Sequence, residues 1–299
     1  MFVTRAKGIR LAGQIRAGIV NWWREFSKSK MGVVGLILFI FITMMVILAP
    51  YVATHDPKLY DPIRAVPPST AHILGTDTWG RDLYSMLLYA GQYSLFVGVV
   101  TAAIVIGIAT TIGLFAGYFG GIIDEILMRT ADVLMVIPRL PLLIVLASFL
   151  SPGLQTIMLI IICLGWTRPA RQIRALTLSV KHYDYVESTK ASGGSSLHII
   201  FHHIFPNVSG VVVAQFVMEV VAVILLETGL SFLGFGDPLR FTWGQILFFA
   251  QQKAALTSGF WWWWLPPGII ITMVCFSLAF IGTTLNDRFV LRLNVRGKD

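Results

Sequence analysis

The sequence TRPARQIRALTLSVKHYDYVESTKASGGSSLHIIFHHIFPN occupies residues 167–207 and separates two long apolar runs of the chain. Residues 184–192 contain no proline and carry apolar side chains at helical spacing. Gly193 and Gly194 follow directly, where a residue in the left-handed conformation would end a helix. We therefore predict a helix over residues 184–192 that stops at the glycine pair.

A second short helix is predicted after the glycine pair. Ser195 and Ser196 are suitable caps for its first turn, and Pro206 is expected to end it. Its apolar residues recur at intervals of three and four, namely Leu197, Ile200, Phe201 and Ile204. A hairpin of two short helices cannot bury its own apolar stripe, so we expect it to pack on its own membrane helices or on another protein.

The composition of the whole chain is that of a membrane protein. Of its 299 residues, 56% are hydrophobic and only 13% are charged, which is too much apolar surface for one soluble domain. A helix of about 20 residues crosses a hydrocarbon core of about 30 Å. Apolar runs that approach this length occur at residues 33–53, 93–117, 131–150, 154–168, 208–228 and 262–284. We predict an all-α, polytopic membrane protein with six transmembrane helices.

The distribution of the net charge of +8 predicts the orientation of these helices and argues against nucleic acid as a partner. Residues 1–31 hold seven Lys or Arg, residues 167–207 hold five, and the tail after residue 284 holds four. The loops 54–92 and 229–260 hold three and two. Because cytoplasmic loops carry the excess of basic residues, both termini and the hairpin are expected to be cytoplasmic, with lipid as the partner of the basic residues.

These patterns divide the chain into consecutive segments. We predict a basic amphipathic segment on the cytoplasmic side, a first membrane helix, an external loop, a five-helix core that contains the hairpin stretch, and a cytoplasmic tail. Their ranges are 1–32, 33–53, 54–92, 93–284 and 285–299.

Glycines in the second apolar run predict that this helix lies inside a bundle. Small residues let helices approach closely in lipid, where packing rather than hydrophobicity drives their association. The run and its flanks contain Gly91, Gly98, Gly107, Gly113 and Gly117.

The first external loop is rich in Pro, Gly and Asp, which is turn chemistry. His72, Asp77 and Asp82 were considered as metal ligands, but their spacing matches no strong ligand pattern, and no metal site is expected. We predict instead a structured loop that caps a pore or meets an external partner. Its candidate residues are Gly75, Asp77, Gly80, Arg81 and Asp82.

Three ionisable residues fall within apolar runs and are candidates for lining a translocation pathway. They are Asp132, Arg139 and Glu219. A charge at the bilayer centre costs at least about 2.5 to 3.5 kcal/mol, so each is expected to lie near a helix end, face the bundle interior or form a pair. A purely structural role for them is the alternative, and Glu227 is expected to lie at the outer surface.

The sequence contains no local signature of catalysis. Phosphate-binding loops of the form G-x-x-x-x-G-K-[ST], H-E-x-x-H motifs and G-x-S-x-G elbows are all missing. A membrane bundle with a docking hairpin and no such motif suggests a pathway that is powered by a partner.

The hairpin resembles a known motif. Glu187 and Gly193, followed by Ile204-Phe205-Pro206, match the spacing of the EAA loop of ATP-binding-cassette (ABC) importer permeases. Ser188 and Thr189 replace the two alanines of that motif. His203 stands at its first isoleucine position and Phe205 replaces its leucine.

Three further stretches resemble the C-type subunit of the dipeptide, oligopeptide and nickel subfamily of these permeases. They are HILGTDTWGRD at 72–82, GYFGG at 117–121 and ETGLSFLGFG at 227–236. Together they run from the first external loop to the sixth span. The C-terminal TLNDRFV at 284–290 departs from the subfamily pattern, so the resemblance implies no role for this tail.

The resemblance implies a non-catalytic permease subunit in the cytoplasmic (inner) membrane of a prokaryote. Its partners would be a homologous second permease, two cytoplasmic ATPases that hold ATP and magnesium, and an external substrate-binding protein. This chain would hold no cofactor. The hairpin would couple to an ATPase through Tyr185, Glu187, Ser188, Thr189, Ala191, Gly193, Leu197, Ile200, Phe201, Ile204 and Pro206.

The substrate class expected from the resemblance is di- or oligopeptides, with oligosaccharides or nickel chelates as alternatives. Two alternative functions belong to other classes of protein, namely a secondary transporter that works alone and a membrane scaffold. A secondary transporter is expected to show paired intramembrane ionisable residues, discontinuous helices and internal repeats. None of these is evident in the sequence.

Overall fold

The computed structural model describes residues 26–57, 59, 62 and 64–296. Almost all regular structure in these ranges is helical, and the extended backbone there forms a single isolated bridge between Thr76 and Asp82. The predicted all-α class is therefore confirmed. The amphipathic segment predicted for residues 1–32 lies almost entirely outside the described residues.

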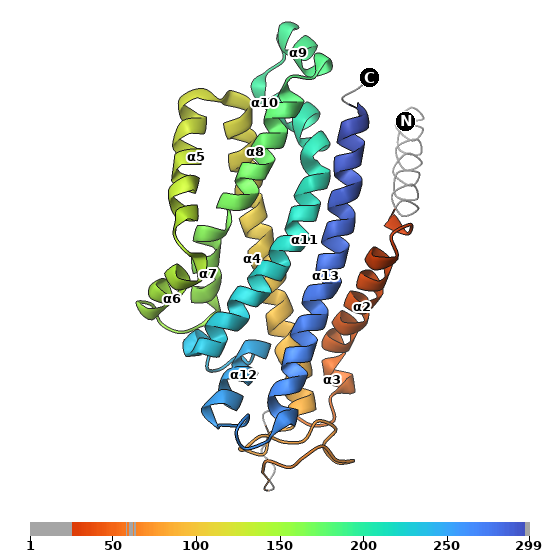
Figure 1. The fold of residues 1–299 in the computed structure, drawn as a ribbon, viewed down its shortest axis with the longest axis vertical. Helices are drawn as coiled ribbons and strands as arrows, with labels where there is room; N and C mark the ends of the chain where they lie inside the picture. Colours follow the sequence, from red (N-terminus) through yellow and green to blue (C-terminus); the bar gives the residue numbers. More distant parts are fainter. Residues whose placement is uncertain (1–25, 58, 60–61, 63, 297–299) are drawn as a thin grey trace, which may run out of the picture.

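The first membrane helix, α2 (Lys30–Ile47), begins where Ser29 accepts a hydrogen bond from the Gly32 amide at 3.2 Å. The short helix α3 (Ala49–Val52) follows it. One side of α2 is exposed and apolar, while Gly35 lies against α13, where an added Cβ would come within 2.6 Å of the Ser277 carbonyl oxygen. The helix thus lies at the edge of the bundle beside α13 (Figure 1).

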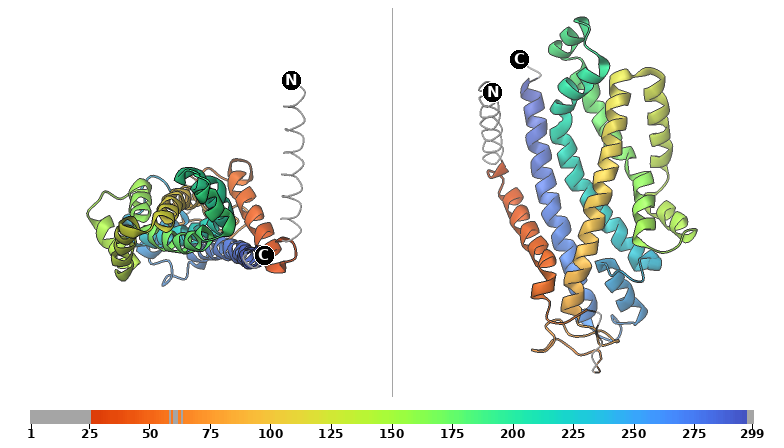
Figure 2. Two further views of the ribbon diagram at one scale, coloured as in Figure 1. Left: turned by 90° about the horizontal axis from the view of Figure 1, so that it is seen from above. Right: turned by 180° about the vertical axis from the view of Figure 1, so that it is seen from behind.

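The central helix is α4 (Leu83–Phe119), which runs the length of the molecule (Figures 1 and 2). Helix α4 therefore already begins inside the segment 54–92 that was predicted to be an external loop. Polar residues made the first turns of α4 look like loop in the sequence, but they bond inside the fold. Gln92 donates to the Val46 carbonyl at 3.0 Å, and Ser94 accepts from the Trp243 amide at 3.0 Å.

Four of the five predicted packing glycines of α4 lie at close helix contacts. A Cβ added at any of these four glycines would lie 2.6 to 2.8 Å from an atom of another helix. The neighbours are Val46 for Gly91, Ile224 for Gly98, Ala170 for Gly113 and Thr177 for Gly117. Gly107 has no neighbour within 4 Å and is exposed.

Neither the third nor the fourth predicted span forms one straight helix of the predicted length. Residues 131–150 are divided between α5 (Gly121–Val136) and α6 (Arg139–Ser148), which meet at an angle of 86°. Pro138 explains the break, since the residue before a proline is driven into extended backbone, and Ile137 has φ −76° and ψ 128°. Residues 154–168 form the 12-residue helix α7 (Leu154–Gly165), which is continued by the polar helix α8 (Thr167–Lys181).

The predicted number of six spans is not confirmed. Within the described ranges, four helical runs are long and apolar enough to cross a membrane, and a fifth crossing results if the bent pair counts as one span. The four are Lys30–Ile47, Leu83–Phe119, Ser196–Phe235 and Trp261–Asp287.

The hairpin leads directly into a membrane helix. After α9 (Asp184–Ala191) come the single turn α10 (Ser196–His198), a π-helical segment η1 (Ile199–Ile204) and α11 (Phe205–Leu230). The prediction that Pro206 ends the second helix is wrong. Pro206 lies in the first turn of α11, where its missing N–H is tolerated, and the wider π-helical turns of η1 precede it.

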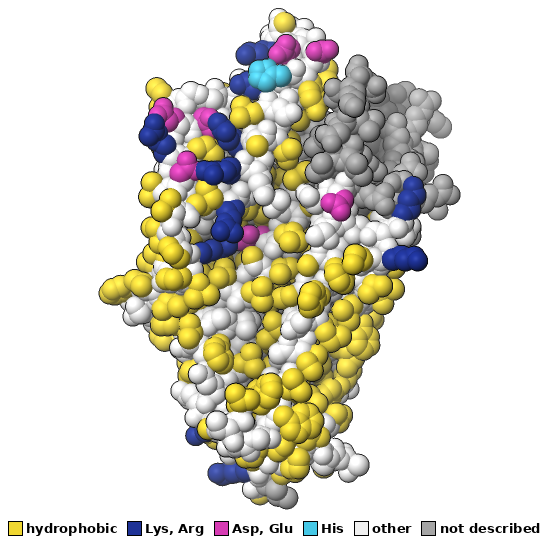
Figure 3. Space-filling model, viewed as in Figure 1, with side chains coloured by type: hydrophobic (Ala, Val, Ile, Leu, Met, Phe, Trp, Pro, Cys, Tyr) yellow, Lys and Arg dark blue, Asp and Glu magenta, His cyan; other side chains and the backbone are white. Residues whose placement is uncertain are grey.

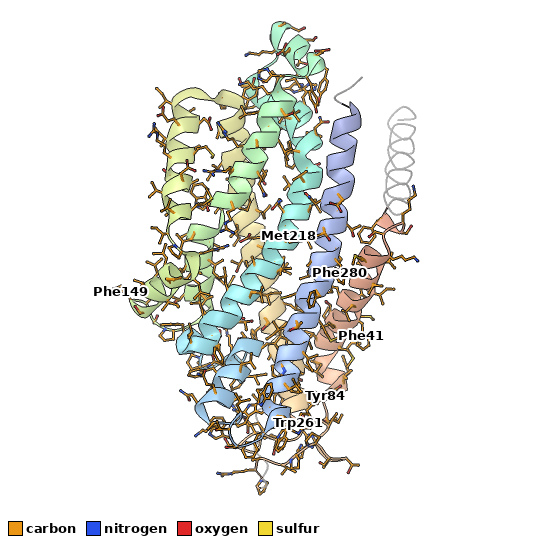
Figure 4. The ribbon with its side chains drawn as sticks, viewed as in Figure 1. Phe41, Tyr84, Phe149, Met218, Trp261 and Phe280 are labelled. Atoms are coloured by element: carbon orange, nitrogen blue, oxygen red, sulfur yellow. The ribbon has the colours of Figure 1, made fainter. Side chains whose placement is uncertain are left out.

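Beyond α11, the end opposite the hairpin is built from η2 (Ser231–Phe235), α12 (Trp243–Gln252) and the start of α13 (Trp261–Arg296). Figure 4 shows Trp261 and Tyr84 at this end, and Met218 midway along α11. Met218 packs over Gly282 of α13, where an added Cβ would lie 2.7 Å from its sulfur.

Charge separates the two ends of the molecule. The end of α13 and the hairpin lie at one end (Figure 1), and Lys, Arg, Asp and Glu side chains gather toward that end on the face drawn in Figure 3. A broad apolar surface covers the middle of the same face. This arrangement suits a protein that is embedded in a bilayer with its basic end in the cytoplasm.

Candidate functional site

The turn of the hairpin has the predicted geometry. Gly193 adopts φ +82°, and Ser195 accepts a hydrogen bond from the His198 amide at 3.4 Å. Gly194 passes so close to Thr189 that a Cβ would lie 2.9 Å from the Thr189 carbonyl oxygen. The turn therefore needs glycine twice, at Gly193 for its backbone conformation and at Gly194 for its close approach.

The base of the hairpin is anchored in the membrane bundle. Ile200 and Ile204 are fully buried, together with Val186 of α9 and Ile199. They pack on Leu114, Tyr118, Ile173, Val180 and Val208. The expectation that Ile200 and Ile204 belong to a surface for a partner is therefore wrong, because α4 and α8 already cover them.

The tip of the hairpin presents a different set of side chains. Leu197 and Phe201 are 54% and 53% exposed although they are apolar. The other predicted coupling residues that are exposed are Tyr185, Glu187, Ser188, Ala191, Gly193 and Pro206, and Thr189 is half-buried. Two large exposed apolar side chains beside a charged helix form a surface suited to a protein partner.

Glu187 lies on the exposed side of α9. Its carboxylate oxygen Oε1 lies 3.4 Å from Nδ1 of His182, and both side chains are more than half exposed. The carboxylate also lines a pocket of about 270 Å³ between α4 and the hairpin. Tyr185 accepts a hydrogen bond from Asn207 at 2.9 Å, which ties α9 to the start of α11.

Two of the three predicted intramembrane ionisable residues, Arg139 and Glu219, form a pair with each other. Arg139, at the break between α5 and α6, donates to Glu219 of α11 over 3.3 Å. Glu219 is buried, and the Arg139 side chain is 26% exposed. This pair links segments that are 80 positions apart in the sequence. Paired intramembrane charges and a broken helix therefore do occur in this protein.

Asp132 of α5 pairs with Arg171 of α8, and both side chains are 52% exposed. Nearer the hairpin, Arg174 of α8 binds Asp124 of α5 through Nε at 2.7 Å and through a second nitrogen. This hydrogen bond raises the pKa of Arg174 above its ordinary value. Two ion pairs thus hold α5 against α8.

The predicted external residues form a compact cap. Asp77 is fully buried and accepts hydrogen bonds from the Trp79 and Arg81 amides and from Arg81 Nε, the last at 2.6 Å. The Arg81 guanidinium lies 4.6 Å from the Trp79 ring centroid and 4.9 Å from that of Phe241. Gly75 and Gly80 take positive φ angles of 74° and 86°. The loop is therefore held on α12 and its flanking residues by a buried cation among aromatic rings.

Asp82 caps α4 and gathers two histidines. Its Oδ2 accepts from the Ser85 amide at 2.8 Å and from the Ser85 hydroxyl at 2.7 Å. Its Oδ1 lies 2.9 Å from His72 Nδ1 and 3.7 Å from His55 Nδ1. His55 did not enter the sequence prediction, because nothing in its spacing to residue 72 or 82 indicates that the loop returns to it.

Glu227 is fully buried near the C-terminal end of α11, and its position at the outer side of the membrane stays a prediction. The Ser231 hydroxyl donates to its carboxylate at 2.7 Å. Gly244 of α12 packs over the Thr228 carbonyl, where an added Cβ would lie within 2.7 Å. The ETGLSFLGFG stretch therefore forms a surface on which α12 packs.

Residues 109–295 match the family of binding-protein-dependent transport system inner membrane components, and residues 20–68 match the N-terminal transmembrane domain of oligopeptide transport permease C. The first match alone covers more than half of the chain. The chain belongs to this family of inner membrane components. It is thus a multi-pass membrane permease subunit and carries no catalytic role of its own.

Individual relatives extend the match to nearly the whole length. The chain is 33% identical to the oligopeptide transport system permease protein OppC of Bacillus subtilis, over 96% of this chain and 95% of the relative. It is 37% identical to the dipeptide transport system permease protein DppC of the same organism, over 74% and 70%. The DppC protein of Haemophilus influenzae is 31% identical over 89% and 92%.

Proposed function

We propose that this inner membrane component forms half of the translocation pathway of an ATP-driven importer for di- or oligopeptides. Its partners would be a homologous second permease, two cytoplasmic ATPase subunits and an external substrate-binding protein. ATP and magnesium would bind in the ATPase subunits. The peptide substrate is supported by the relatives named above, which are dipeptide and oligopeptide permeases.

The hairpin of α9 and α10 would be the contact with an ATPase. The observation that carries this proposal is the division of its apolar residues. Ile200 and Ile204 anchor the hairpin in the bundle, whereas Leu197 and Phe201 project from it beside the exposed Glu187. A rigidly anchored hairpin with an exposed apolar tip is suited to insertion in a groove of a partner and to transmission of its movement.

Within the membrane, Arg139 and Glu219 are proposed to border the pathway. Asp132 is a weaker candidate, because its half-exposed pair with Arg171 joins α5 to α8. The external cap that includes Gly75, Asp77, Gly80, Arg81 and Asp82 would cover the outer end of the pathway and face the substrate-binding protein.

Charge reversal at the hairpin tests the coupling surface. The variant Glu187→Lys is expected to reduce co-purification of the ATPase subunits with the permease at least tenfold and to reduce peptide-stimulated ATP hydrolysis in parallel. Glu125→Lys is the matched control, since Glu125 is also exposed and pairs with Arg129 on α5 outside the hairpin. Equal co-purification of ATPases by both variants would refute the coupling role.

The substrate requires a separate measurement. The complete complex in proteoliposomes is expected to accumulate a labelled tripeptide only when ATP and the substrate-binding protein are both supplied. Oligosaccharide or nickel chelate uptake without peptide uptake would replace the peptide assignment and leave the coupling role untouched. Uptake by this permease alone, driven by an ion gradient, would instead indicate a secondary transporter.

A further inference from the structure

The external cap contains a cluster of possible metal ligands that the transport function does not use. His55 follows α3, His72 lies in the loop, and Asp82 is the cap of α4. One ligand atom from each lies within 4.8 Å of the other two. Asp77, which stands near His72 and Asp82 in the sequence, is bound to Arg81 and is unavailable.

The distances suit a small divalent ion. In a tetrahedral zinc site with bonds of about 2.0 to 2.1 Å, neighbouring ligand atoms are about 3.3 Å apart. The two histidine Nδ1 atoms lie 2.9 and 3.7 Å from Asp82 Oδ1, on either side of that value. The imidazole rings are 4.6 Å apart and inclined by 30°, so the two histidines lie side by side next to the carboxylate.

The carboxylate is already oriented for this task. Asp82 Oδ2 is fixed by two hydrogen bonds from Ser85, which leave Oδ1 directed at the histidines. Partners of this kind orient ligands in metal sites and raise their basicity. The Asp82 side chain is 1% exposed, and burial of its charge favours a cation beside it.

An ion could also reach the cluster. The His55 side chain is 43% exposed, whereas that of His72 is 10% exposed. The three residues line an open pocket of about 240 Å³ with Asp56, Leu59, Pro62 and Gly80. This gives an entry path and room for a water molecule or an external ligand in the remaining coordination position.

We propose that His55, His72 and Asp82 bind a divalent transition-metal ion on the external face, with Zn²⁺ as the best match. Neutral imidazoles and a carboxylate are ligands that zinc accepts, and three protein ligands leave one position open. Binding requires the tautomer of His72 that carries its proton on Nε2. The ion then takes the place of the proton between Nδ1 and Oδ1 and fastens the end of α3 to the start of α4.

The test is Zn²⁺ binding to the full-length permease, purified in detergent with a histidine-free affinity tag and treated with a chelator. Calorimetric titration is expected to give one tight site per chain. His55→Gln should weaken binding about 10- to 100-fold or more, because it removes a ligand whose half-exposed side chain contributes little to folding. Zn²⁺ should raise the Tm of the unmodified protein and leave that of His55→Gln nearly unchanged.

His182→Gln is the control, because His182 is an exposed histidine at the other end of the molecule. It should bind Zn²⁺ like the unmodified protein. Substitution of Co²⁺ should give the intense visible absorption of tetrahedral coordination, and His72→Gln should abolish it. The proposal is overturned if His55→Gln binds Zn²⁺ as tightly as the unmodified protein, if no stoichiometric site exists, or if only His182→Gln weakens binding.

Discussion

Gly193 combines a positive φ of 82° with open space around its Cα. There is room for a larger side chain at this position, so glycine is required only because of the backbone conformation. A non-glycine residue in this region of backbone conformation costs about 1 to 2 kcal/mol. That cost falls on the turn between α9 and α10, while the bundle beneath is unaffected.

We therefore expect Gly193→Val to change coupling more than stability. The hairpin should lose its fixed shape, and ATP-driven uptake in proteoliposomes should fall at least fivefold, while the Tm of the permease falls by only a few degrees. Gly107→Val is the control, because Gly107 is exposed, has a regular helical φ and has no neighbour within 4 Å. Unchanged uptake by Gly193→Val would show that the turn is not needed for coupling.

At the scale of elements, the segment from α10 to η1 has two faces with different tasks. Ile200 is fully buried on α4 and α8, and Phe201, its neighbour in sequence, is 53% exposed. Truncation of a buried isoleucine costs about 2 to 5 kcal/mol, whereas an exposed side chain contributes little to folding.

The two alanine variants should separate these tasks. Ile200→Ala is expected to lower the Tm of the permease clearly, by the loss of packing in the bundle. Phe201→Ala should change the free energy of unfolding by no more than about 0.5 kcal/mol and should weaken ATPase co-purification. A Phe201→Ala variant that destabilises the permease but still retains its ATPases would contradict the proposed division.

The contact of α4 with α8 depends on glycine for a different reason. A Cβ at Gly117 would lie 2.6 Å from the Thr177 Cβ, so the two helices touch along their backbones. Gly117→Leu should force them apart and cost about 1 to 3 kcal/mol or more, measured as a lower Tm in detergent. Gly107→Leu on the same helix should be nearly neutral, and equal losses in both variants would refute the close contact.

At the scale of the whole molecule, the Arg139–Glu219 pair joins the broken span to α11. Removing one partner of a buried pair costs about 3 to 5 kcal/mol, and somewhat less here because Arg139 is partly exposed. Glu219→Ala should therefore lower the Tm and the rate of peptide uptake together. The exchanged pair, Arg139→Glu with Glu219→Arg, should recover part of the Tm. If the exchanged pair recovers neither the Tm nor peptide uptake, Glu219 has a role beyond its pairing with Arg139.

Much of the fold was accessible from local sequence signals. The apolar runs predicted the membrane class, and the glycine pair with Ser195 predicted the hairpin turn and its cap. These features depend on neighbours in the chain, because a positive φ, a helix cap and an apolar run are all local properties. The four confirmed packing glycines of α4 follow from the same kind of signal.

Two of the errors share one physical cause, since each concerns a partner that is distant in sequence. The start of α4 was missed because the polar side chain of Gln92 finds its acceptor on α2, at the Val46 carbonyl. Ile200 and Ile204 were assigned to an interface because periodicity cannot tell which protein covers an apolar stripe.

The sequence by itself determined the membrane class, the hairpin with its glycine turn and the chemical types of the candidate residues. Only the tertiary structure decided which side chains meet. It placed Arg139 against Glu219 and brought His55 to His72 and Asp82. The physical reason is that hydrogen bonds and ion pairs depend on distances of a few ångströms, and folding, rather than spacing along the chain, sets those distances.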